Sequence, residues 1–174
     1  MNSIKYLFLL FFCSHSLTMI IDNLDDIKAD WTAISDQVMG GISEVNFNLI
    51  DDGNEKFYRL KGEVSTKNNG GFIQSRVNIN INSDNYEGLR IKVKGNNNEY
   101  YVHLRVPRMM PWNYYYAKFY ASEEWSVVEL PLKSFKFSRN KNISLKSSKI
   151  NSIGLVAYGR NFYAELDIGN IELY

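Results

Sequence analysis

Two nearby segments of the chain place aromatic and charged side chains at alternate positions. The residues concerned are Tyr101, His103, Arg105, Tyr114, Tyr116 and Lys118, with Trp112 between the two segments. Tyrosine and tryptophan rings join a large apolar area to a polar group, so they suit the C–H faces of sugar rings. Tyrosine, tryptophan and arginine are also enriched at the hot spots of protein interfaces. The pattern favours a surface that binds a glycan or a protein partner; the alternative is aromatic residues that only pair across strands.

Catalytic chemistry has little support in the same residues. The chain has two histidines and one cysteine, and His103 has no nucleophile or acid beside it in the sequence. A general base needs such a partner within hydrogen-bond reach, and neither G-x-S-x-G nor H-E-x-x-H occurs. We therefore expect a binding protein and not an enzyme, with no catalytic residue, no cofactor and no metal site. Two carboxylates that are distant in sequence but close in the fold are the enzyme alternative.

A cluster of aspartates precedes the first tryptophan, at Asp22, Asp25, Asp26 and Asp30. Ca²⁺ prefers oxygen ligands of this kind, but the ordered ligand spacing of a calcium loop is missing. We interpret the cluster as a solvated acidic turn and keep a structural calcium as the alternative.

The elements that must position the aromatic residues are strands, because apolar residues recur at every second position in most of the chain. We expect strands around residues 57–65, 73–81, 89–93, 100–106, 115–121, 125–130, 152–158 and 163–173. Asn- and Gly-rich turns separate them, which is typical of an all-β, antiparallel sandwich or barrel. If Tyr100 and Val102 point inward, the six alternating residues point outward on one face. We expect the cations of residues 90–94 (Arg90, Lys92, Lys94) beside them.

Composition limits the number of domains and the classes of partner. The chain has 174 residues, of which 45% are hydrophobic and 22% charged, and its formal net charge is +1. This length and composition predict one globular domain with a real core. A DNA- or RNA-binding domain usually carries a clearly basic surface, so we expect no nucleic-acid partner.

The first residues resemble a secretory signal peptide. Lys5 precedes an apolar run at residues 6–12, and Ser14 and Ser16 supply small residues for cleavage. We expect a leader at residues 1–16 and a single β-sandwich domain at 17–174, exported to the periplasm or secreted. The apolar run is too short to cross a bilayer as a helix, so we expect no membrane span after leader removal. A mitochondrial location is the alternative, although residues 1–21 lack the arginines of a transit peptide.

Glycine pairs mark two loops that flank an expected strand. The residues are Trp31, Ser35, Asp36, Met39, Gly40, Gly41 and Ser43 in the first segment, and Asn69, Gly70 and Gly71 in the second. Glycine permits positive φ and close backbone approach, and Asp or Asn side chains satisfy loop amides. The two loops are interpreted as structural corners, with a second binding site at residues 35–43 and Asn69 as the alternative.

The order of these elements resembles the complex I intermediate-associated protein 30 family. The matching motifs are Ser35-Asp36-Gln37-Val38-Met39-Gly40-Gly41-Ile42-Ser43, Asn68-Asn69-Gly70-Gly71-Phe72, Tyr86-Glu87-Gly88-Leu89, Leu130-Pro131 and Ser152-Ile153-Gly154-Leu155. The resemblance implies a galactose-binding-like jelly roll and a non-catalytic role. Mitochondrial members of the family assist assembly of respiratory complex I, and many carbohydrate-binding modules share the fold. The resemblance therefore implies an assembly factor or chaperone that recognises a protein, with a carbohydrate-binding module as the alternative.

Overall fold

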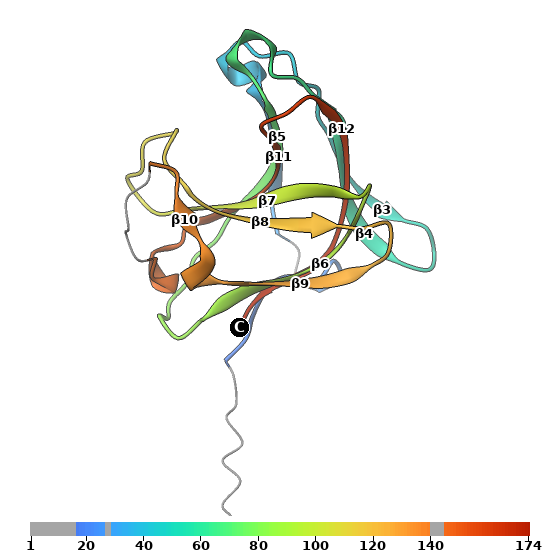
Figure 1. The fold of residues 1–174 in the computed structure, drawn as a ribbon. Helices are drawn as coiled ribbons and strands as arrows, with labels where there is room; N and C mark the ends of the chain where they lie inside the picture. The colour runs from blue at the N-terminus through green and yellow to red at the C-terminus, as the bar shows by residue number, and fades with distance from the viewer. Residues whose placement is uncertain (1–16, 27–28, 140–144) are drawn as a thin grey trace, which may run out of the picture.

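The chain folds into two antiparallel β-sheets that pack face to face (Figure 1). The computed structural model describes residues 17–26, 29–139 and 145–174, so the expected leader at 1–16 lies outside the described residues. The strands are β1 (Met19–Asp22), β2 (Trp31–Ser35), β3 (Asn46–Asp51), β4 (Lys56–Val64), β5 (Phe72–Asn78), β6 (Gly88–Gly95), β7 (Asn98–Arg105), β8 (Tyr115–Ala121), β9 (Ser126–Pro131), β10 (Lys136–Phe137), β11 (Ser152–Tyr158) and β12 (Phe162–Leu173).

The order of the strands differs from their order in the chain. In the first sheet the order is β3-β4-β12-β6-β9, and β1 also pairs with β12. The second sheet has the order β10-β8-β7-β11-β5-β2. Short 3-10 turns connect some of the strands, including η1 (Asp36–Met39), η2 (Lys67–Asn69) and η3 (Leu132–Ser134). Within the described ranges, none of the helical segments is long and apolar enough to cross a membrane.

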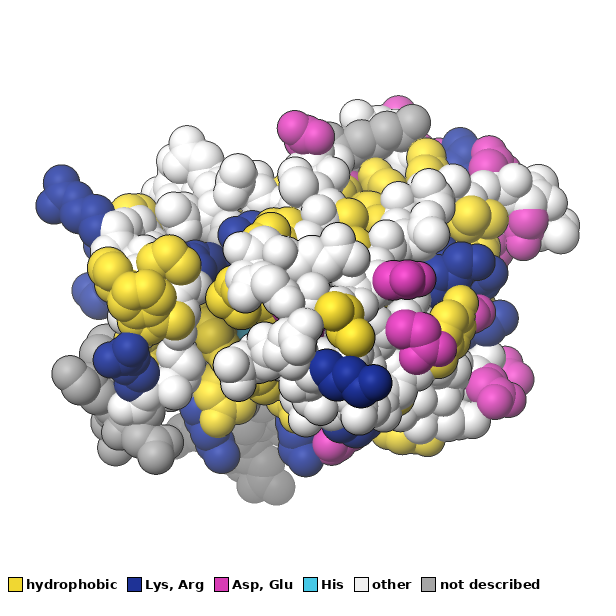
Figure 2. All heavy atoms as spheres, turned by 90° about the horizontal axis from the view of Figure 1, so that it is seen from above, with side chains coloured by type: hydrophobic (Ala, Val, Ile, Leu, Met, Phe, Trp, Pro, Cys, Tyr) yellow, Lys and Arg dark blue, Asp and Glu magenta, His cyan; other side chains and the backbone are white. Residues whose placement is uncertain are grey.

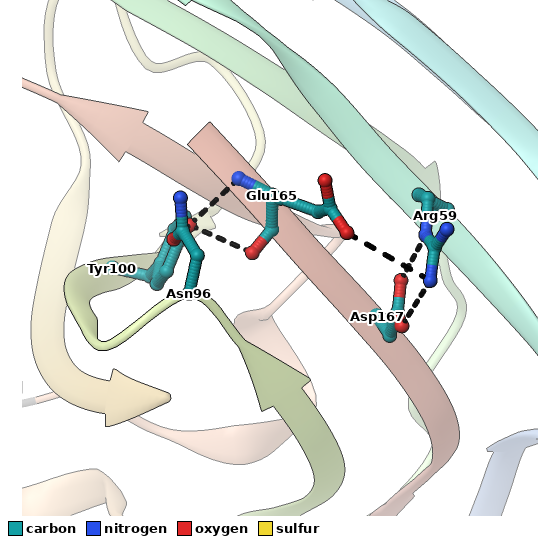
Figure 3. Close-up of polar contacts among 5 residues, drawn as sticks. All are labelled: Arg59, Asn96, Tyr100, Glu165 and Asp167. Carbon is teal, nitrogen blue, oxygen red and sulfur yellow. Dashed lines mark hydrogen bonds and ion pairs between the residues drawn. The ribbon is translucent and has the colours of Figure 1, made fainter. Parts of the chain in front are cut away.

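The core lies between the two sheets, and most of its buried residues come from β4, β5, β6, β7, β8, β11 and β12. In β7, for example, Tyr100, Val102 and Leu104 are completely buried. The Tyr100 hydroxyl avoids the cost of an unpaired buried polar group, because it accepts from the Glu165 backbone N–H at 2.9 Å and lies 2.6 Å from Asn96 Oδ1 (Figure 3). The alternation therefore directs the intervening residues of β7 to the outer face of the second sheet.

The expected all-β, antiparallel sandwich is confirmed, and each expected strand is present within a few residues of its bounds. The strands that sequence reasoning missed are β1, β2, β3 and β10. Two of them are very short, and β2 and β3 lie at sheet edges where both faces are partly exposed. Period-two burial is weak in such strands.

One expected neighbourhood is wrong. The cations of residues 90–94 do not lie beside the aromatic row, because β6 belongs to the first sheet and β7 and β8 to the second. Arg90 instead forms ion pairs with Glu129, at 2.8 Å, and with Glu172, all within the first sheet. Alternation sets the face of a side chain relative to its own strand, but it does not identify the sheet to which that strand belongs.

Candidate functional site

The outer face of the second sheet carries a groove of about 740 Å³, which we call the second-sheet groove. Its floor is formed by β5, β11 and β7, and its two walls by β2 with η1 and by the loop between β7 and β8. The lining residues are Ile34, Val38, Met39, Phe72, Gln74, Arg76, His103, Arg105, Pro111, Trp112, Tyr114, Ser152, Gly154, Val156 and Tyr158. Figure 2 shows hydrophobic side chains around a hollow in which a histidine is partly visible.

Backbone forms the middle of the floor, because Gly154 has no side chain. In the sheet register Gly154 lies between His103 on β7 and Arg76 on β5. A Cβ atom at this position would lie 3.1 Å from Gln74 Oε1, a tight contact. Glycine thus keeps the floor low between two polar side chains.

His103 forms the centre of an aromatic cluster on the floor. Its ring stacks on Tyr114, with 4.0 Å between ring centroids and 17° between ring planes, and it lies 6.1 Å from the ring of Tyr158. Burial and the nearby guanidinium groups of Arg76 and Arg105 lower the pKa of His103 to about 3. The imidazole is therefore neutral at pH 7, with one nitrogen as a donor and the other as an acceptor.

Arg105 positions one wall of the groove. Its guanidinium donates to the backbone carbonyls of Pro111 at 2.7 Å, Met110 at 3.1 Å and Met109 at 3.2 Å. These three bonds hold the loop that carries Trp112, whose side chain is 54% exposed. Arg105 is therefore a positioning residue for the aromatic wall, and its guanidinium N–H groups already donate to backbone carbonyls of the protein.

The opposite wall is apolar and belongs to η1. Val38 is 73% exposed and Met39 is 65% exposed, although both are hydrophobic. The buried carboxylate of Asp36, in the same turn, holds this segment in place. The carboxylate accepts hydrogen bonds from the backbone N–H of Ser43 at 2.9 Å and from the Ser43 hydroxyl at 2.5 Å. It also accepts from the backbone N–H of Gly71 at 2.5 Å.

Asp36 therefore joins the two glycine-rich loops that the sequence singled out. Burial by itself would raise its pKa, but the bonds from Ser43, Gly71 and Phe72 outweigh burial and lower the pKa below the ordinary value. A Cβ atom on Gly41 would lie 2.3 Å from the Asp36 carboxylate, and one on Gly70 would lie 2.4 Å from it. These contacts account for glycine at both positions without any ligand.

The structure brings the expected binding residues to one face, but only some of them line the groove. His103, Arg105, Trp112 and Tyr114 line it, as does Met39 from the motif loop. The three other members of the expected row, which are Tyr101, Tyr116 and Lys118, lie beside the groove on β7 and β8. Lys118 is ion-paired with Glu99 at 2.7 Å.

Sequence reasoning missed several lining residues. Gln74 and Arg76 alternate with inward-facing residues of an expected strand, so the sequence alternation could have placed them on the outer face of the sheet. Gly154 and Tyr158 carried no such signal, because β11 is buried on both faces for most of its length. Trp31 lies elsewhere: its indole N–H donates to Asp22 at 2.8 Å, and its ring packs near Phe47 with 6.1 Å between centroids.

The aspartate cluster is only partly the solvated turn that the sequence predicts. Asp22 is completely buried and accepts from the backbone N–H groups of Leu24 at 2.8 Å and Ala29 at 2.9 Å. Asp25 is exposed and forms an ion pair with Lys56 at 2.8 Å. In the part of the chain that the structure describes, no group of three or more His, Cys, Asp or Glu is placed to hold a metal ion.

The sequence matches the model of one protein family, described as Complex I intermediate-associated protein 30, over residues 22–168. This match confirms the resemblance that the motifs predict. A comparison with curated proteins found no match.

The fold is similar to that of solved carbohydrate-binding modules. One is a family 11 module from Clostridium thermocellum in complex with a β-1,3-1,4-mixed-linked tetrasaccharide; the TM-score is 0.72 with 15% sequence identity, covering 90% of this chain and 94% of that chain. Another is a family 30 module of a cellulosomal cellulase of Clostridium thermocellum; the TM-score is 0.63 with 12% identity, covering 91% of this chain and 97% of that chain. This likeness shows the jelly-roll fold.

Proposed function

The chain belongs to the Complex I intermediate-associated protein 30 family, and we propose that it is a non-catalytic binding protein whose second-sheet groove holds a saccharide chain. The observation that carries the proposal is the groove itself, with apolar and aromatic walls above a floor of hydrogen-bonding groups. Its volume of about 740 Å³ lies within the range of roughly 300–1,000 Å³ for small-ligand sites. The ligand of the family 11 module supports a saccharide as the occupant.

The chemistry of the walls and the floor suits a sugar ring. Trp112 and Tyr158 present exposed aromatic faces, on which the C–H faces of a pyranose pack. Gln74 and Ser152 on the floor offer donors and acceptors for sugar hydroxyls, and so does neutral His103. Among the lining residues that the structure describes there is no Asp or Glu to serve as a general acid or base, which supports binding without catalysis.

Two tyrosines of similar exposure provide a matched test. Tyr158 lines the groove and is 42% exposed, whereas Tyr163 on β12 of the first sheet is 46% exposed. We expect Tyr158→Ala to weaken saccharide binding about tenfold, because an aromatic contact contributes about 0.5–1.5 kcal/mol beyond area burial. Tyr163→Ala should bind like the wild type. Isothermal titration calorimetry with ligands found on a glycan array measures both, and equal losses in the two variants would contradict the proposal.

A second variant tests the floor. Gly154→Leu places a side chain in the middle of the groove without requiring a positive φ. We expect the variant to fold and to lose binding. Saturable saccharide binding by a folded Gly154→Leu protein would place the ligand elsewhere.

A protein segment is the second candidate for the groove. Val38 and Met39 are hydrophobic side chains that are mostly exposed, and Met and Trp residues are enriched at protein interfaces. The family description, which names a complex I intermediate, points the same way. Co-purification of one defined protein that is lost in Val38→Asp, together with no saccharide response, would favour this candidate.

We also propose that residues 1–16 are a cleaved leader and that the domain at 17–174 acts after export. Mass spectrometry of the mature amino terminus tests this directly. A terminus near residue 17 supports export, and a retained leader contradicts it. A shortened chain recovered from mitochondria would support the mitochondrial alternative.

A further inference from the structure

Arg76 is a half-buried cation on the floor of the second-sheet groove with no ion-pair partner among the described residues. It projects from β5 beside Gly154, on the other side of which lies His103. Burial, followed by the like charge of Arg105, lowers its pKa, and no carboxylate contributes to that shift. Partial burial of a guanidinium without a negative partner has a cost, and a carboxylate bound in the groove would offset it with a charge that the described part of the fold does not supply.

Several other cations on the two sheets, including the arginines Arg59 and Arg90, are paired with acids. Arg59 forms a two-bonded pair with Asp167, at 2.6 Å and 2.7 Å (Figure 3). Arg90 contacts Glu129 and Glu172, and Lys118 contacts Glu99. Among the arginines of the described strands, the two that line the second-sheet groove, Arg76 and Arg105, form no ion pair with an acid.

Within residues 17–26, 29–139 and 145–174, no acid pairs with Arg76. Arg105 is a second cation in the groove, and its donors are already bonded to loop carbonyls. Arg139 adds a third cation at the rim, where its guanidinium lies 6.0 Å from the Trp112 ring. On the face in Figure 2, most acidic side chains gather on the right, away from the hollow. The groove therefore has a positive potential, within a chain whose net charge is only +1.

We propose that the saccharide bound in the second-sheet groove is acidic, and that a uronate carboxylate of the sugar pairs with the Arg76 guanidinium. This inference rests on the proposed function, because it names the class of saccharide. The planar fork of arginine matches a carboxylate with two parallel hydrogen bonds. The aromatic walls pack on the sugar ring, while Gly154 leaves the floor low enough for the carboxylate to reach β5.

The experiment compares matched ligands on the intact protein. Calorimetric titrations use oligogalacturonate, oligomannuronate and hyaluronan oligosaccharides, each beside its carboxyl-methylated form, which keeps the chain and removes the charge. A mixed-linked β-glucan tetrasaccharide and a sulfated oligosaccharide complete the set. We expect at least one uronate ligand to bind about tenfold to a hundredfold more tightly than its methylated form, the range of a hydrogen bond to a charged group.

Variants locate the charge. Arg76→Gln should remove the difference between the acidic ligand and its methylated form, and Arg76→Lys should keep part of it. Lys133→Gln, on the exposed turn η3, removes the same charge away from the groove and should leave the difference unchanged. Urea unfolding confirms that the compared variants are folded.

The outcomes separate the two proposals. Tight binding of neutral oligosaccharides with no preference for the uronate forms would overturn the acidic ligand and leave the saccharide groove standing. Binding of the sulfated ligand alone, or an unchanged preference in Arg76→Gln, would overturn the Arg76–carboxylate pair. If no saccharide binds, or if only an acidic peptide does, the proposed function fails as well.

Discussion

The interpretation of Asp36 as the link between two loops predicts a large loss of stability in Asp36→Asn. The carboxylate is completely buried and accepts four hydrogen bonds, two from Ser43 and one each from the backbone N–H groups of Gly71 and Phe72. An asparagine has one acceptor oxygen in place of two. With that oxygen in the Oδ2 position it retains three of the bonds, and its NH₂ group then faces the Ser43 N–H.

The magnitude follows from these contacts. The Ser43 N–H loses its acceptor inside the protein, at a cost of about 1–3 kcal/mol. The three retained bonds change from charged to neutral, which weakens each by roughly 1 kcal/mol. Relief from burying a charge offsets part of the loss. We therefore expect the free energy of unfolding to fall by about 3–5 kcal/mol, a large share of the 5–15 kcal/mol typical of a domain.

Urea unfolding followed by tryptophan fluorescence measures this change, and Asp52→Asn is the matched control. Asp52 also accepts from two backbone N–H groups, those of Asn54 at 3.0 Å and Glu55 at 2.9 Å, but it is exposed. Water can replace those bonds, so the control should change stability far less. The reasoning is refuted if Asp36→Asn unfolds like the control and yet loses ligand binding, since the loops would then be a binding site.

Three further predictions concern His103, Arg59 and Arg105. The pKa of His103 is about 3 in the folded protein and about 6.5 in the unfolded chain. The contribution of neutral His103 to stability is therefore full above pH 6.5 and is lost as the pH falls toward 3. The free energy of unfolding should fall by up to about 1.4 kcal/mol per pH unit below pH 6.5, and His103→Phe should abolish the fall between pH 6.5 and 5. Parallel pH profiles would contradict this. Arg59→Met leaves the buried Asp167 unpaired and should lower the free energy of unfolding in urea by about 3 kcal/mol. The double variant with Arg59→Met and Asp167→Leu should recover most of this loss. A double variant no more stable than the single one would count against a buried pair. Arg105→Ala should leave unfolding nearly unchanged but speed hydrogen exchange at the Asn113 amide, which bonds to the Met110 carbonyl, at least tenfold; unchanged exchange would mean that other contacts hold the loop.

The sequence by itself determined the fold class and the facing of most strands. Alternation in segments such as 100–106 and 115–121 reflects burial of one strand face, a local property that each segment records independently. The outward direction of Tyr101, His103 and Arg105 followed from this parity, and the spaced loop motifs identified the family.

The tertiary structure alone decided which strands are neighbours and therefore which side chains meet. Arg76, 27 residues before His103 in the chain, lies near it only because β11 pairs with both β5 and β7 and presents Gly154 between them. The pairing of β6 with β12 and β9 placed its cations in the other sheet, and Arg76 has no ion-pair partner among the described residues. Long-range pairing depends on the packing of the whole core and leaves no periodic signal in one segment, so the groove and its charge emerge only when the sheets are assembled.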